Sequence, residues 1–247
     1  MLCKNQVVGQ LKNGRLYIHP CGQCLACRIN DTRAWYVRSR FELKKLDRPF
    51  HYFLTLTYND ENLPEDNYCD KTHLKKFLNN LNTSFGLSMR YYGCSDYGSI
   101  NNRAHYHAII TSTKKITQEQ VERIWKKGFV YLKPLNDNNL RYVLRYTVKK
   151  KPFDNKEKGF FRLISKGWGN NVKEFYTGQE YFVFDGKKYG INPYLRQKLG
   201  LEKNDLKTYF NNTTMITYSK EYKENVPSFD KFVEQMQDLV NYRRRLK

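Results

Sequence analysis

Long hydrophobic runs and secretion signals are what this sequence lacks. Its 247 residues contain no stretch of about 18 apolar side chains, which excludes a transmembrane helix. Residues 1–6 contain no apolar segment of the kind that directs secretion. Internal repeats and low-complexity linkers are not visible either. We therefore expect a cytoplasmic protein whose cysteines are reduced.

Two further shortages narrow the class of protein. The pattern GxxxxGK[ST] is absent, so the chain is not a P-loop ATPase. Acidic residues number 24 against 44 Lys and Arg, and the resulting formal charge of +20 favours a polyanionic partner. A basic surface that serves solubility alone is the alternative. The 20 Tyr, 15 Phe and 3 Trp offer rings on which unpaired bases can stack, so the composition favours nucleic acid.

The spacing of apolar residues predicts an α+β fold in which helices flank an antiparallel sheet. Strands are expected at 50–58, 89–93, 104–111, 129–132, 181–184 and 187–189. Helices are expected at 31–46, from an Asp70 cap to Leu81, from a Thr117/Gln120 capping box to Trp125, at 138–150, and from Ser228 onward. Three parts follow from this pattern: a cysteine-rich segment at 1–27, a core at 28–150, and a basic, aromatic extension of unknown role at 151–247.

His105 and His107 stand two residues apart in the strand expected at 104–111. Side chains of a strand alternate between its faces, so both imidazoles project from the same face. Such a pair makes half of a divalent-metal site, which an oxygen ligand would complete. Asp96, at the end of the preceding strand of the hairpin, is the best candidate for that ligand. Taken alone, the pair is equally compatible with a structural role.

Tyr142 and Tyr146 stand four residues apart in the helix expected at 138–150, so they lie one turn apart on one face. Lys149 follows Tyr146 by three residues on the same side and can place a cation beside a phosphate. The alternative is that both rings only help to bury an amphipathic helix. Beside the histidine pair, the two phenols are candidate nucleophiles.

Cys21, Cys24 and Cys27 have the spacing CxxCxxC, and Cys3 could supply a fourth thiolate. In a reducing compartment such a cluster favours a metal over disulfides, and our interpretation is a structural Zn²⁺. Free thiols are the main alternative, and an iron–sulfur cluster is a third.

Several motifs occur together and in a fixed order. They are PCGQCLACR at 20–28, FLTLTY at 53–58, DYG at 96–98, RAHYH at 103–107 and YVLRYTVK at 142–149. In these motifs the chain resembles HUH endonucleases of the replication-initiator class, with their His-hydrophobic-His strand followed by a YxxxYxxK helix. More closely, it resembles the replication initiation proteins of single-stranded DNA microviruses in the gokushovirus-like group. The resemblance covers residues 20–150 well and departs at two positions: Asp96 replaces the usual Glu, and Arg145 stands where Lys would complete YxxK after Tyr142.

The resemblance implies an HUH core, RRM-like or ferredoxin-like, that nicks single-stranded origin DNA in the cytoplasm of a bacterial host. Mg²⁺ or Mn²⁺ on His105, His107 and Asp96 would polarise the scissile phosphate. Tyr142 or Tyr146 would attack that phosphate and leave a 5′-phosphotyrosine and a free 3′-OH. The same site can later rejoin the ends.

The partners implied are the origin strand, a host DNA polymerase that extends the 3′-OH, and a host helicase that unwinds the duplex. The helicase is needed because the chain has no P-loop. The expected DNA contacts are Arg103, Arg145 and Lys150.

Two alternative functions stay open. The first is a plasmid initiator, a transposase or a relaxase with the same core. Relaxases usually carry their tyrosine upstream of the histidines, and a single-tyrosine transposase would not need two phenols. The second is a zinc-stabilised, non-catalytic module for single-stranded DNA, which predicts salt-sensitive binding without nicking.

Overall fold

The computed structural model describes residues 3, 7–10, 16–98, 103–145 and 160–201. The chain divides into two compact units, Met1–Asp31 with Gly200–Lys247 and Thr32–Leu199. The division at 1–27, 28–150 and 151–247 that the sequence suggests stays a prediction. Within the described ranges, no helix combines the length and the apolar character that crossing a membrane requires.

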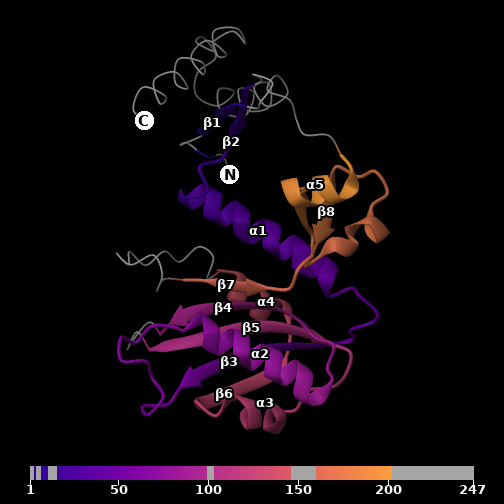
Figure 1. Cartoon of the computed structure of the whole chain (residues 1–247). Helices are drawn as coiled ribbons and strands as arrows, with labels where there is room; N and C mark the ends of the chain where they lie inside the picture. The colour runs from indigo at the N-terminus through magenta and orange to yellow at the C-terminus, as the bar shows by residue number, and fades with distance from the viewer. Residues whose placement is uncertain (1–2, 4–6, 11–15, 99–102, 146–159, 202–247) are drawn as a thin grey trace. The chain divides into compact units, whose positions relative to one another are not determined.

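The larger unit is built on a five-stranded sheet with the strand order β6-β3-β5-β4-β7, in which every neighbouring pair is antiparallel (Figure 1). The strands are β3 (Phe50–Tyr58), β4 (Arg90–Tyr97), β5 (Ala104–Ser112), β6 (Gly128–Pro134) and β7 (Arg162–Ile164). The expected α+β class with an antiparallel sheet is therefore confirmed.

Strand β4 is longer than the sequence pattern predicts. The expected strand ends at Gly93, whereas the observed one continues to Tyr97. Gly93 stays paired inside the sheet, opposite Ala108 of β5. A Cβ at Gly93 would lie 3.2 Å from the side chain of Leu74, so this glycine marks a close approach of helix to sheet and not a strand end. The extension carries Asp96 into the sheet.

Helices cover both faces of the sheet (Figure 1). They are α1 (Leu25–Glu42), α2 (Lys71–Phe85), α3 (Gln118–Trp125) and α4 (Asp137–Arg145). Helices α2 and α3 share one buried core with Leu54 and Leu56 of β3. Helices α1 and α4 share the other core with Phe53, the neighbouring residue on the opposite face of β3. The alternation along β3 therefore separates two cores, one on each side of the sheet.

Capping residues fix the starts of α2 and α3 as the sequence predicts. The Asp70 carboxylate accepts the Thr72 N–H at 2.6 Å. Thr117 and Gln120 form a capping box at the start of α3. Both helices therefore begin where their first unsatisfied N–H groups find a side-chain acceptor.

Helix α1 begins earlier than the sequence predicts. The Asn30-Asp31 pair indicates a cap for a helix at 31–46, yet α1 spans Leu25–Glu42. A helical turn already starts in the cysteine segment, where the Arg28 N–H donates to the Cys24 carbonyl at 3.0 Å. The cap signal consequently lies inside the helix. The expected continuation of α4 to residue 150, and the helix from Ser228, lie outside the described residues.

A further layer packs on α1 within the larger unit. It consists of η1 (Asn170–Phe175), the antiparallel hairpin β8 (Tyr181–Phe184) and β9 (Lys187–Gly190), and α5 (Pro193–Leu199). The rings of Phe175, Phe182 and Phe184 lie 4.7 to 5.7 Å from the ring of Phe41, centroid to centroid. The expected hairpin is present, and its aromatic residues serve as core for α1.

The described part of the smaller unit contains one antiparallel strand pair, β1 (Val7–Gln10) and β2 (Leu16–His19). The cysteine segment directly follows β2 in the sequence and leads into α1.

Candidate active site and metal centres

Strand register brings three ligand side chains together in the larger unit. Asp96 of β4 pairs directly with His105 of β5, and His107 follows on the same face. The Asp96 Oδ2 atom lies 3.1 Å from His105 Nε2 and 3.7 Å from His107 Nε2. Asp96 and His107 are 3% and 4% exposed, so the site is buried on its inner side. The three residues that the sequence suggests as metal ligands therefore meet in one place.

Hydrogen bonds behind the rings set how the two imidazoles face this site. His105 Nδ1 lies 2.9 Å from the carbonyl oxygen of Arg103, which can only accept, so Nδ1 carries the proton. His107 Nδ1 lies 2.9 Å from Thr55 Oγ1 of β3. A neutral His105 then turns an Nε2 lone pair toward the Asp96 carboxylate, an arrangement that a cation between them would stabilise. The donor set of two imidazoles and one carboxylate fits a divalent metal ion.

Tyr142 of α4 stands beside this triad. Its ring centroid lies 5.1 Å from that of His107 and 6.2 Å from that of Phe53. The side chain is 43% exposed, so the phenol is accessible. Val143 and Leu144 next to it are fully buried and fix the rotation of α4 about its axis. Tyr146, Lys149 and Lys150 lie outside the described residues, and their expected roles stay predictions.

The two described arginines expected to contact DNA have different surroundings. Arg103 donates to the Tyr58 carbonyl at 3.0 Å and forms an ion pair with Asp60 at 2.7 Å. Arg145 at the end of α4 is exposed and lines a pocket. Arg103 is therefore held near the metal triad by the protein itself, whereas Arg145 is available to an external anion.

Two exposed aromatic residues on edge strand β6 are not singled out by the sequence analysis. Phe129 is 69% and Tyr131 is 52% exposed. Phe129 is in register with Thr57, which pairs with His105, and Tyr131 is in register with Thr55, which pairs with His107. Both rings therefore lie on the face of the sheet that carries the histidines. The alternation of Phe129 and Tyr131 with half-buried Val130 could have revealed them.

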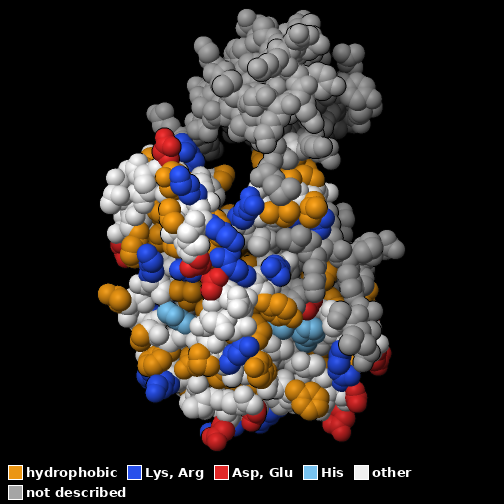
Figure 2. Space-filling view, turned by 180° about the vertical axis from the view of Figure 1, so that it is seen from behind, with side chains coloured by type: hydrophobic (Ala, Val, Ile, Leu, Met, Phe, Trp, Pro, Cys, Tyr) orange, Lys and Arg blue, Asp and Glu red, His pale blue; other side chains and the backbone are white. Residues whose placement is uncertain are grey.

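Figure 2 shows the molecule from the side opposite to Figure 1. Histidine side chains reach the surface there, beside apolar side chains and with Lys and Arg around them. A surface that combines rings with cations can hold an unpaired nucleic acid strand by stacking and by phosphate contacts.

A second candidate metal centre lies in the smaller unit. The thiols of Cys3, Cys21, Cys24 and Cys27 lie within 4.8 Å of one another. Three of the sulfur–sulfur distances are 3.4, 3.7 and 3.8 Å. Four sulfurs at about 2.3 Å from a tetrahedral zinc would lie about 3.8 Å apart, so the cluster has the size that zinc requires.

Backbone groups around these sulfurs favour thiolates. The N–H groups of Cys24 and Gln23 point at Cys21 Sγ at 3.3 and 3.4 Å and lower the pKa of that thiol to about 6. Burial raises the pKa of the Cys27 thiol to about 12, so without a cation this group stays protonated. A metal ion would replace that proton, as thiolate ligation requires.

Cys69 lies outside both clusters and is not expected from the sequence to take part in either. Its buried thiol donates to the His105 carbonyl at 3.2 Å and to the Asp96 carbonyl at 3.5 Å. This residue therefore ties the loop before α2 to the strand ends that carry two of the ligands. A single cysteine in a polar loop gives no pattern from which this contact could have been predicted.

Comparison with known proteins gives one family and several relatives. Residues 51–151 match the family model described as replication-associated protein of the ORF2 type. Replication-associated protein ORF2 of Spiroplasma virus 4 is 32% identical over 53% of this chain and 48% of its own length. Replication-associated protein ORF4 of Chlamydia phage 1 is 26% identical over 53% of this chain and 38% of its own.

A third relative is matched over more of its length. Replication-associated protein VP4 of Bdellovibrio phage phiMH2K is 24% identical over 92% of this chain and 81% of its own length. By contrast, the match spans half or less of the first two relatives. The matched family region contains the Asp96, His105 and His107 triad together with Tyr142.

Proposed function

The chain belongs to the replication-associated ORF2 family of microvirus-like phages, and from this premise we propose that it is a metal-dependent HUH endonuclease that initiates rolling-circle replication. It nicks single-stranded origin DNA in the bacterial host through a tyrosine and later rejoins the ends. The observation that carries this proposal is the convergence of Asp96, His105, His107 and the exposed phenol of Tyr142.

The metal ion is Mg²⁺ or Mn²⁺ in this proposal, and when bound it polarises the scissile phosphate and offsets the negative charge that develops there. Asp96, His105 and His107 hold it. The Arg103 carbonyl and the Thr55 hydroxyl keep the two rings turned toward the site. These two contacts leave Nε2 of each imidazole as the ligand atom.

Tyr142 is the described nucleophile. Its phenol oxygen attacks phosphorus in line, so that an O–P bond to tyrosine forms while the bond to the 3′ oxygen breaks. The phenol proton ends on the released 3′-OH, from which a host polymerase extends the strand. The phosphotyrosine keeps the energy of the broken diester, so attack by a 3′-OH can rejoin the ends. Tyr146, with Lys149 beside it, is the second nucleophile of the proposal.

The strand to be cut lies across the face of the sheet that carries the triad. Phe129 and Tyr131 provide stacking surfaces for unpaired bases beside His105 and His107, and Lys133 follows on the same face of β6. Arg103, Arg145 and Lys150 supply phosphate contacts in this proposal. A host helicase opens the duplex ahead of the site.

The cysteine cluster holds a structural Zn²⁺ in the same proposal. Four thiolates fill a tetrahedral shell and leave no position for a substrate, so its contribution is to the stability of the smaller unit.

One assay tests the nuclease. The full chain is incubated with phage single-stranded DNA and Mn²⁺, the products are denatured, and covalent protein–DNA adducts are counted. We expect adducts that require the metal and disappear with EDTA. Salt-sensitive DNA binding without any adduct would contradict the proposal and favour the non-catalytic single-strand-binding module.

A further inference from the structure

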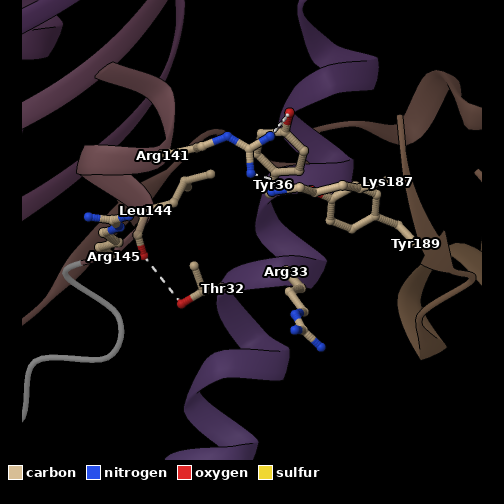
Figure 3. A pocket seen from close by; sticks show the side chains of 8 residues that line it. All are labelled: Thr32, Arg33, Tyr36, Arg141, Leu144, Arg145, Lys187 and Tyr189. Atoms are coloured by element: carbon tan, nitrogen blue, oxygen red, sulfur yellow. Dashed lines mark hydrogen bonds between the residues drawn. The ribbon is translucent and has the colours of Figure 1, made fainter. Parts of the chain in front are cut away.

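A pocket of about 240 Å³ lies between α1, α4 and β9, wholly within the larger unit. Figure 3 shows that side chains from all three elements surround it. Its polar lining comes from Arg33, Tyr36, Arg141, Arg145, Lys187 and Tyr189. Four of these side chains are cations, and the lining contains no acidic residue.

The charges in and beside this pocket do not cancel. Arg141 and the neighbouring Arg40 both pair with Asp137 and Asp185, at distances of 2.5 to 3.2 Å, which makes two cations against two carboxylates. Three more cations of the lining are exposed and, among the described residues, form no ion pair: Arg33, Arg145 and Lys187. A net charge of about +3 therefore faces a concave surface, where low-dielectric walls strengthen its attraction for an anion.

The walls of the pocket are fixed before any ligand arrives. The Tyr36 hydroxyl accepts from Arg141 Nη2 at 2.7 Å and contacts both Asp137 and Asp185 at 2.8 Å. Arg141 Nη1 also donates to the Tyr189 hydroxyl at 3.3 Å. These bonds connect α1, α4 and the hairpin, so little ordering remains to be done on binding. Figure 3 shows Arg141 and Tyr36 joined on one side of the space and Arg33 and Arg145 apart from them.

We propose that this pocket binds a backbone phosphate of the single strand, separate from the phosphate that is cut. The identity of the ligand as DNA rests on the proposed function. Planar guanidinium groups suit phosphate oxygens, and two of the three uncompensated cations are arginines. Tyr142, whose ring lies against His107, precedes Arg145 by three residues on α4. One strand can thus engage both sites, and the pocket holds α4 against the DNA while its phenol reacts.

Binding of a labelled thymidine oligonucleotide, measured by fluorescence anisotropy across a salt series in EDTA, tests this inference without cleavage. The test variant is Arg33→Ala/Arg145→Ala/Lys187→Ala. Its control, with the same change in net charge, is Lys75→Ala/Lys114→Ala/Lys115→Ala, all exposed and outside the pocket lining. Each phosphate that the protein no longer neutralises should make the slope of log K against log salt shallower by about 0.7. We expect this in the pocket variant, with affinity about tenfold lower, and almost no change in slope in the control.

Equal changes in the two triple variants would overturn the inference, because only net charge would then matter. A second arm titrates inorganic phosphate into the DNA-free protein, followed by NMR. Phosphate binding that the pocket variant loses, together with an unchanged DNA slope, would assign the pocket to a free phosphate compound and also overturn the inference. Arg145→Ala alone replaces the triple variant if the latter does not fold. If the wild type forms no adduct while the pocket variant still has the shallower slope, the nuclease proposal fails and the pocket assignment stands.

Discussion

The cysteine cluster and the Asp96/His105/His107 triad each bring metal-ligand atoms within 4.8 Å of one another, yet the chain assembles them by different means. Three of the four cysteines fall within residues 21–27, so local spacing alone reveals that cluster. The triad depends on the register of two strands, in which Asp96 lies opposite His105. The first site can thus be read from spacing, whereas the second requires the sheet.

The two sites also differ in what they leave open. Four thiolates complete a tetrahedral shell, which is typical of structural zinc. The triad supplies only three ligands and has an exposed phenol beside it, at 5.1 Å between the rings of Tyr142 and His107. An incomplete shell next to a nucleophile is what a reactive metal site needs. The comparison therefore predicts that the two sites respond differently to substitution and chelation.

Removal of a triad ligand should have the largest effect on cleavage. His107→Ala should lower adduct formation by about 10²- to 10³-fold or more, because charge stabilisation at the scissile phosphate is removed. DNA binding should be largely kept, since Lys and Arg contacts to phosphate supply most of the affinity. Adduct formation and anisotropy measure the two effects. His51→Ala, at the start of β3, is the matched control.

Equal loss of cleavage and binding in a folded His107→Ala protein would assign the histidine pair to structure or to DNA contact. Asp96→Asn extends the test to the oxygen ligand and should weaken Mn²⁺ binding. An unchanged manganese titration of that variant would place the third ligand elsewhere.

Zinc content should separate the two sites next. We expect about one Zn²⁺ per chain in purified protein, absent from Cys24→Ser but kept in Cys94→Ala, whose buried thiol lies outside the cluster. Mild chelation should remove the ion from the triad and leave the thiolate-bound zinc. Elemental analysis measures both. Protein prepared under reducing conditions that contains no zinc would rule out the zinc assignment.

A smaller effect is expected from the groups behind the ligands. Thr55→Val removes the hydroxyl at His107 Nδ1, and its loss should weaken metal affinity by about 10- to 100-fold. Thr57→Val, two residues along β3 and in register with His105, is the control. Manganese titration followed by electron paramagnetic resonance compares the two. Equal affinities would show that the Thr55 hydroxyl has no part in orienting the ring.

The smallest effect is expected from a single tyrosine. Tyr142→Phe keeps the ring against His107 and removes only the hydroxyl. Cleavage of an oligonucleotide should fall only several-fold, since Tyr146 one turn away can substitute. Tyr142→Phe/Tyr146→Phe should be inert. On a circular template each single variant should accumulate attached, unresolved products. If Tyr142→Phe completes replication cycles at the normal rate, Tyr142 is a packing residue.

The sequence predicts most of the larger unit because its signals are local. The caps at Asp70 and Thr117 and the apolar pattern of β3 predict their elements almost residue by residue. Errors arise where a local signal meets a tertiary requirement. Gly93 indicates a strand end by its residue type, but in the structure it admits Leu74 to the sheet.

The site is predictable to the same extent. The positions of His105 and His107 follow from alternation along one strand, whereas the contribution of Thr55 depends on pairing with residues 52 positions away. Phe129 and Tyr131 gain meaning only when the order of strands places β6 next to β3. Neither relation is encoded in the spacing of residues along the chain.

The Tyr36 hydroxyl has a consequence for how the protein is made. Its contacts reach Asp137 and Asp185, which are 101 and 149 residues further along the chain. At about 5–20 residues per second, a ribosome needs on the order of ten seconds to pass from Tyr36 to the last of these partners. The network cannot close until the hairpin has emerged, so α4 receives its final anchor late in synthesis. A nascent chain that already contains the histidine strand is thereby kept from holding its tyrosine helix in place until the larger unit is nearly complete.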